Sequence, residues 1–202
     1  MSSAPTVYAF EGIVPVIDPS AYVHPAAVLI GDVIVGPGCY VGPGAVLRGD
    51  FGRIVLGRNA NLQDNCVVHS APDFDCVMEE ESHIGHGAVI HCARIGRDAL
   101  VGIHAVVMDT AVVGEQAIVA AMSFVKVADA IPPRVLVAGV PARVRRSLSD
   151  DDIAWKRRGT ALYIELARRA LDGGIVAARP LERVEEGRAR ANWEFASVRD
   201  RK

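Results

Sequence analysis

The sequence predicts an all-β solenoid, a parallel β-helix followed by one C-terminal α-helix, and two observations support this prediction. Aliphatic residues recur at every sixth position over most of the chain, and side chains with such a period stack on their counterparts one coil away in a solenoid. The chain is 50% hydrophobic but only 5% aromatic, so its interior must be built from many small aliphatic layers. Its 202 residues fit one domain with a terminal appendage.

The repeats begin near residue 23 and keep one register, apart from two long steps and one five-residue step. Glycine often follows the apolar anchor, as at Gly42, and a small residue often stands four places after it, as at Ala45. Glycine relieves the tight corner between short strands, and a small side chain fits where the chain bends inward. The anchors are Val23, Leu29, Val35, Val41, Leu47, Leu56, Leu62, Val68, Ile84, Ile90, Ile95, Val101, Val107, Val113, Val119, Val125, Ile131 and Val137.

Two longer steps interrupt the register. The step from Leu47 to Leu56 is nine residues, and the step from Val68 to Ile84 is sixteen, which is two hexapeptides plus four residues. The sequence therefore predicts a loop extruded around residues 72–81, rich in acidic residues. Loops of this kind often lie over a functional surface.

The period changes after Pro141, so we divide the chain into a β-helix domain at 1–142 and a C-terminal segment at 143–202. The first 133 residues hold 6 basic and 14 acidic residues, and the rest hold 16 basic and 10 acidic ones. Ser149 and Asp152 have capping-box spacing and predict a helix start, and Gly173 with Gly174 predicts its end. The helix should lie along the flank of the β-helix. The tail, with Trp193 and Phe195, has no predicted element.

Composition excludes several classes of protein. A formal net charge of −2 argues against obligatory nucleic-acid binding, and no run of about 18 apolar residues predicts a membrane span. The first ten residues lack the features of a signal peptide, so a cytoplasmic protein is expected. The four cysteines have no CxxC spacing and are expected to be reduced thiols.

Three of the six histidines are related through the repeat. His69 and His91 each follow an anchor, and these anchors are three repeats apart once the loop is discounted. If three repeats make one coil, the two imidazoles stack on one face and can share a metal ion. His86 belongs to the preceding face and should project from a corner. A third ligand could still come from a neighbouring molecule packed around a threefold axis. His24 has no partner, and His83 and His104 could face the same cleft without touching the metal.

Polar residues interrupt the repeat beside these histidines. Gln63 stands six residues before His69 and could orient a zinc-bound hydroxide. Arg48 and Asp50 lie where the register breaks, and they could form an ion pair that locks subunits together or could polarise a substrate.

The motifs LRGDFGRI, NLQDNCVVH and HIGHGAVIH, in this order on hexapeptide repeats, resemble the γ-class carbonic anhydrases and their relatives. Further segments, among them YAFEGIVPV, IVAAMSFVK, GVPARVRR and DIAWKRRGT, are similar to the branch that contains the phenylacetate-pathway thioesterase PaaY and the carnitine-operon protein CaiE. The resemblance covers residues 7 to about 190. It implies a left-handed β-helix that forms a homotrimer, with zinc bound between subunits.

The resemblance also implies roles for individual residues. It assigns His69, His86 and His91 as metal ligands, with iron or cobalt as alternatives to zinc because three histidines do not determine the metal. It places Gln63 beside the metal-bound water. It places Arg48, Asp50 and Asp64 in the interface network.

One departure from the family pattern bears on function. The archaeal prototype enzymes have a glutamate after RGD and a further acidic residue soon after the first histidine, both used in proton transfer. Phe51 follows Asp50 here, and SAPDF follows His69. Fast CO2 hydration, which must export a proton in every cycle, is therefore in doubt.

The favoured hypothesis is a metal-dependent hydrolase of the PaaY type, which cleaves acyl-CoA thioesters with a zinc-bound hydroxide at the trimer interface. Arg143, Arg145 and Arg146 could meet the phosphates of CoA. Three alternatives stay open: a γ-class carbonic anhydrase that hydrates CO2 to bicarbonate, a CaiE-like accessory protein without turnover of its own, and an acyltransferase, for which no committed base is visible.

Overall fold

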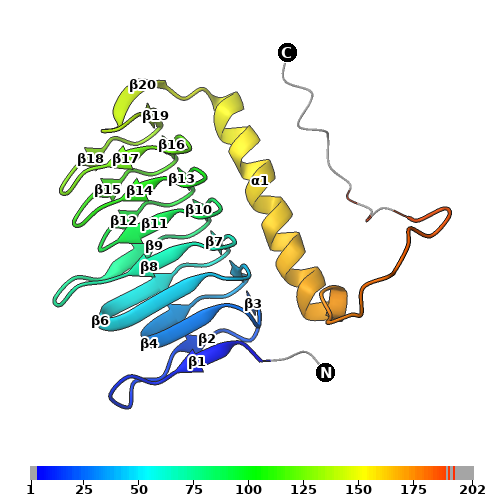
Figure 1. Cartoon of the computed structure of the whole chain (residues 1–202). Helices are drawn as coiled ribbons and strands as arrows, with labels where there is room; N and C mark the ends of the chain where they lie inside the picture. The colour runs from blue at the N-terminus through cyan, green and yellow to red at the C-terminus, as the bar shows by residue number, and fades with distance from the viewer. Residues whose placement is uncertain (1–3, 190, 192, 194–202) are drawn as a thin grey trace.

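Short strands stack coil upon coil into a solenoid of about seven coils, and one helix runs along its flank (Figure 1). The computed structural model describes residues 4–189, 191 and 193. Among the described residues, the strands pair in parallel except for the last two, β19 and β20, which are antiparallel. The predicted all-β solenoid with a C-terminal helix is confirmed, whereas the handedness and the trimer implied by the resemblance stay predictions.

The first face of the solenoid is an eight-stranded sheet. Its strands, in spatial order, are β3 (Tyr22–Val23), β5 (Tyr40–Val41), β7 (Asn61–Leu62), β10 (His83–Ile84), β13 (Leu100–Val101), β16 (Ile118–Val119), β19 (Val135–Ala138) and β20 (Arg143–Ser147).

The other two faces belong to one twelve-stranded sheet, because two long strands, β4 (Val28–Val35) and β6 (Val46–Leu56), pass around the corner between them. The second face adds β1 (Thr6–Tyr8), β8 (Val67–His69), β11 (Val89–His91), β14 (Val106–Val107) and β17 (Phe124–Val125). The third face adds β2 (Val16–Ile17), β9 (Cys76–Met78), β12 (Arg94–Ile95), β15 (Val112–Val113) and β18 (Ala130–Ile131).

The predicted anchors form the core. On the second face Leu47 pairs with Val68, which pairs with Ile90, and the ladder continues through Val107 and Val125. All five side chains are completely buried. Strands of adjacent coils lie about 4.8 Å apart, so aliphatic side chains in one ladder contact each other directly.

The extruded loop is shorter than the sequence predicted. Met78 pairs with Leu56 on one side and Ile95 on the other, and it is completely buried. It is an anchor that the six-residue register skipped, because the extra residues are inserted before it, at 70–75. Glu79 and the two acids after it consequently lie at a regular corner of the coil, and the prediction that the loop extends to residue 81 was wrong.

Helix α1 (Asp150–Arg169) lies against the first face. Ser149 caps it through the predicted capping box with Asp152. A one-turn π-helix, η1 (Ala170–Gly174), follows, and Gly173 there has a φ of +87°, which glycine adopts without strain. The polypeptide leaves the helix at the predicted position and extends away from the solenoid (Figure 1). Phe195 lies outside the described residues.

The outward side chains of the first face explain why the helix lies there. The strands align Tyr22, Tyr40, Asn61, His83, Leu100, Ile118 and Leu136 in one column. A column that is mostly apolar needs a cover, and α1 packs on β5 and β7 at its lower end.

Candidate metal centre

His69 and His91 are brought together at the ends of two adjacent strands on the second face. They are partners in the parallel register of β8 and β11. His69 Nδ1 lies 3.2 Å from His91 Nε2, and the ring centroids are 5.2 Å apart. The stacking predicted from the repeat is confirmed.

Each imidazole has a carboxylate beside its other nitrogen. Asp50 Oδ1 lies 3.2 Å from His69 Nε2. Asp109 Oδ1 approaches His91 Nδ1 to 3.0 Å, although without a well-directed hydrogen bond. A carboxylate favours the tautomer whose proton faces it. On this assignment, the two nitrogens that face each other both carry lone pairs.

The electrostatics favour this arrangement. Burial works against ionisation of Asp50, but hydrogen bonds from Arg48 and His69 outweigh it and lower the pKa of this carboxyl. Burial lowers the pKa of His69, even though Asp50 acts against this shift. His69 is therefore neutral near pH 7, which is the form that binds a metal.

The pair fits a divalent metal ion. Two lone pairs at 3.2 Å repel each other unless a cation lies near both. Zinc–nitrogen bonds of about 2.0–2.1 Å in a tetrahedron place two ligand nitrogens about 3.3 Å apart. Carboxylates on the distal ring nitrogens are also typical of histidines that bind metals.

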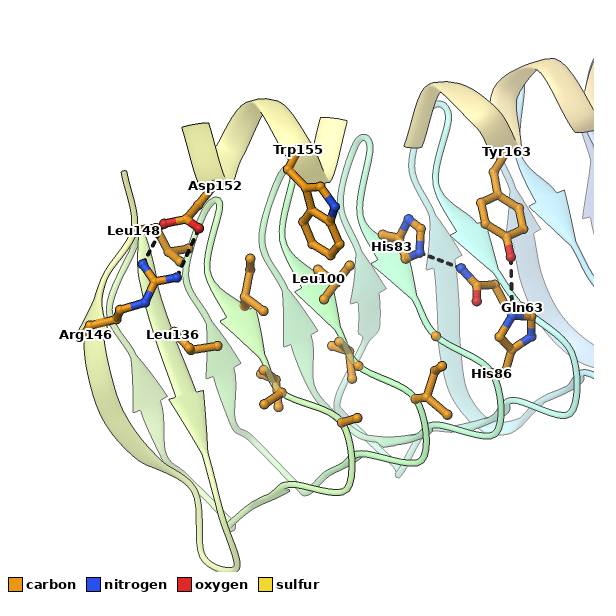
Figure 2. A pocket seen from close by; sticks show the side chains of 18 residues that line it. Gln63, His83, His86, Leu100, Leu136, Arg146, Leu148, Asp152, Trp155 and Tyr163 are labelled. Carbon is orange, nitrogen blue, oxygen red and sulfur yellow. Dashed lines mark hydrogen bonds and ion pairs between the residues drawn. The ribbon is translucent and has the colours of Figure 1, made fainter. Parts of the chain in front are cut away.

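His86 lies on a different face. It follows β10 at a corner of the first face, with Asp64 Oδ2 at 3.4 Å from its Nδ1 and the Tyr163 hydroxyl at 3.5 Å from its Nε2 (Figure 2). Gly87, with a φ of +67°, turns the chain directly after it. The structure therefore does not join His86 to His69 and His91 within one chain, and its role as third ligand stays a prediction.

Gln63 is on the same face as His86, not beside His69. Its Nε2 lies 2.5 Å from His83 Nε2 and 3.1 Å from Asn61 Oδ1. His83 also contacts Asn61 Nδ2, at 3.2 Å from its Nδ1. Burial lowers the pKa of His83 to about 3. A neutral, buried imidazole thus holds the Gln63 amide in place.

Arg48 and Asp50 form the predicted ion pair at 2.7 Å, and through Asp50 this pair reaches His69. Phe51 lies over both ends of the network: its ring centroid is 5.4 Å from that of His69 and 5.8 Å from the Arg48 guanidinium carbon. Phe51 is 58% exposed. An apolar surface therefore borders the histidine pair.

Sequence reasoning missed Asp109 and Tyr163. Asp109 stands two residues after the anchor Val107, one coil beyond His91. The repeat could therefore have placed this carboxylate near His91. Asp109 also lies close enough to His91 and Cys92 for their ligand atoms to fall within 4.8 Å of one another. Burial and Asp109 raise the pKa of the Cys92 thiol to about 11, so this thiol is a poor metal ligand near pH 7.

The other predicted participants lie elsewhere. His24 Nδ1 accepts a hydrogen bond from the backbone of Ala26. The Arg146 guanidinium donates two hydrogen bonds to the Asp152 carboxylate, at 2.6 and 3.0 Å. No helix in the described part of the chain is long and apolar enough to cross a bilayer.

The fold and its repeat define a hexapeptide-repeat protein, and comparisons with known proteins agree. Residues 15–49 match the family model described as bacterial transferase hexapeptide (six repeats). The carnitine operon protein CaiE of Salmonella agona is 53% identical over 183 residues, which are 91% of this chain and 92% of that protein. CaiE of Escherichia coli K12 is 52% identical over 91% of this chain and 93% of its own. The chain belongs to the CaiE family.

Two solved structures are also similar to this chain. A hexapeptide transferase family protein from Anaplasma phagocytophilum has a TM-score of 0.78 and 34% identity, over 81% of this chain and 96% of its own. A perosamine N-acetyltransferase mutant from Caulobacter crescentus, in complex with CoA and GDP-perosamine, has a TM-score of 0.55 and 26% identity over 62% of this chain and 56% of its own.

Proposed function

We propose that the protein is a metal-dependent hydrolase of acyl-CoA thioesters whose metal is shared between two subunits. The observation that carries the proposal is the pair of imidazole nitrogens 3.2 Å apart, each on a ring whose other nitrogen faces a carboxylate. Such a pair is incomplete as a zinc site, because structural and catalytic zinc both have at least three protein ligands.

His86 of a neighbouring copy is the proposed third ligand. Its Nδ1 faces Asp64, as the other two rings face Asp50 and Asp109, so all three histidines have the same kind of partner. Its side chain is 43% exposed, and its Nε2 would exchange the Tyr163 hydroxyl, at 3.5 Å, for the metal. Closed cyclic symmetry would repeat such a contact at every interface.

Zinc in a three-histidine site supplies a water that ionises near neutral pH and a Lewis acid for a carbonyl oxygen. The protein positions the reactants around it. His83 and Asn61 hold the Nε2 of Gln63, which leaves its Oε1 to accept a hydrogen bond from a water near His86. Arg48 and Asp50 hold the His69 ring.

A thioester fits the surroundings better than CO2. The exposed Phe51 ring beside His69 provides apolar surface that CO2 does not need. No acidic side chain takes the Phe51 position to export protons, and a thiolate leaving group needs little acid assistance. The CoA bound by the Caulobacter crescentus acetyltransferase supports a substrate of this class.

The test is hydrolysis of acyl-CoA by the zinc-loaded protein, and the rate is measured from the free thiol that is released. We expect His91→Ala to lose bound zinc and to lower the rate by at least two orders of magnitude. His24→Ala, which changes a histidine away from the pair, should keep both. Hydrolysis by His91→Ala at the wild-type rate would contradict the proposal.

A further inference from the structure

A cavity of about 490 Å³ lies between α1 and the first face, and most of it extends from His83 towards the C-terminal coils, to the left in Figure 2. Its floor is the upper half of the outward column, Leu100, Ile118 and Leu136, and Trp155 and Leu148 close it on the helix side. We call this space the helix cavity. Sites for small organic ligands are typically about 300–1,000 Å³ and mostly apolar.

The polar groups of the helix cavity are confined to its two ends. Gln63, His83, His86 and Tyr163 stand towards one end, and the Arg146–Asp152 ion pair stands at the other (Figure 2). Arg146 and the backbone of Ser149 lower the pKa of Asp152, so the far end remains charged. The ends therefore differ: one offers hydrogen-bonding groups next to the proposed metal ligand, and the other is closed by a salt bridge.

The repeat makes the space between the two ends apolar. His86, Ile103 and Ala121 occupy the same corner position in successive coils, because their anchors pair in the sheet. The polar side chain at this position is thus replaced by apolar ones as the coils advance. From β10, at the His86 end, to β19, at the far end, is three coil spacings or about 14 Å.

We propose that the helix cavity binds the apolar acyl group of the substrate, with the thioester carbonyl at the Gln63 and His86 end. This inference rests on the proposed function for the reaction but on the cavity alone for binding. It predicts a substrate class: acyl groups of medium length without a charged far end, since Arg146 and Asp152 neutralise each other there.

Binding is measured with a thioether probe that cannot be hydrolysed, S-octyl-CoA, against S-ethyl-CoA, by titration calorimetry on the intact protein. Each buried methylene strengthens binding about fourfold, and we expect the octyl probe to bind at least tenfold more tightly. His91→Ala, which removes a proposed metal ligand, should keep this preference. Loss of hydrolysis with retained preference would then separate the reaction from the binding site.

Ile118→Trp fills the centre of the cavity and should abolish the octyl preference. Val112→Trp is the matched control, because Val112 is also the outward residue before an anchor but lies on the third face and is 41% exposed. Leu136→Trp fills only the end farthest from His86, so it should weaken octyl binding but leave binding of S-butyl-CoA unchanged. This variant also reports on folding, since retained butyl binding requires an intact site.

Equal affinity for octyl and ethyl probes in the wild-type protein would overturn the proposal. So would an octyl preference that survives Ile118→Trp. Failure of the octyl probe to bind, together with shielding of Trp155 from a soluble quencher in the unliganded oligomer, would assign the cavity to a contact between copies of the chain instead.

Discussion

Carboxylate–histidine pairs define the candidate centre at the scale of single residues. Three aspartates, Asp50, Asp64 and Asp109, each stand within 3.4 Å of a histidine nitrogen. Asp50 is itself held by Arg48. An imidazole oriented in this way offers its second nitrogen as a lone pair, which is the form that the proposed metal site requires.

Asp109→Asn tests this role. An amide can no longer select the tautomer of His91, so we expect zinc affinity to fall about 10–100-fold. A competition titration with a fluorescent chelator measures the affinity. Asp75→Asn, an exposed acid in the loop, should leave the affinity unchanged. Equal zinc affinities for Asp109→Asn and the wild type would show that Asp109 does not support the site.

His83 predicts a pH dependence of stability. Its pKa is about 3 in the folded protein and about 6.5 in an unfolded chain. The unfolded state therefore binds more protons between these values, so stability is full above about pH 6.5 and is lost as the pH falls towards 3. From pH 6 to pH 4 this histidine alone should remove about 2 kcal/mol.

Urea unfolding of the wild type and of His83→Gln across this range measures the effect. The variant should show a shallower dependence on pH, because glutamine does not titrate. Parallel curves for the two proteins would mean that His83 has the same pKa in the folded and unfolded states.

The residues of the candidate site were partly predictable from the sequence. The register placed His69 and His91 together because both follow an anchor in adjacent coils. The register could not predict the contact between Gln63 and His83, because this contact depends on the packing of long side chains on the outer surface under α1. The outward column becomes visible in the sequence only when the residues of each coil are aligned with those of the next coil.

At the scale of elements, helix α1 is fastened to the solenoid by a buried charge cluster. Asp98 Oδ1 accepts a hydrogen bond from Lys156 at 2.7 Å, and its Oδ2 accepts one from Arg157 at 2.8 Å. The side chains of Asp98 and Lys156 are 1% and 2% exposed. Lys156 also donates to the backbone carbonyl of Glu81. The helix is thus held to the solenoid through residues next to Trp155 of the helix cavity.

Asp98→Asn should destabilise the protein by about 3–5 kcal/mol, because it leaves the Lys156 ammonium buried without its counter-charge. Asp151→Asn, at an exposed position of the first helical turn, should change stability by less than about 0.5 kcal/mol. Chemical unfolding at pH 7 measures both. A change below about 1 kcal/mol in Asp98→Asn would show that Lys156 reaches water when its partner is removed.

The ends of the helix followed from capping chemistry, whereas its exact course did not. Ser149, Asp152 and Gly173 mark the ends by local rules that need no tertiary contact. Met78 shows the opposite case. It lies six residues before Ile84, but the sequence does not tell whether the extra residues of this step are inserted before or after it.

At the scale of the whole molecule, the two halves of the candidate centre lie on different faces of the solenoid. His69 and His91 belong to the second face, and His86 with Gln63 belongs to the first. A single chain therefore offers two incomplete sites. The proposed cyclic assembly would complete them by placing the first face of one copy against the second face of the next.

Mixing of subunits tests this arrangement most directly. His91→Ala and His86→Ala chains are unfolded together in equal amounts, refolded, and analysed for bound zinc. Each variant alone should bind almost none. In a trimer, every mixed assembly regains one intact site, so the mixture should hold about a quarter of the wild-type zinc per chain. Zinc no higher in the mixture than in the separate variants would contradict a metal site shared between neighbouring subunits.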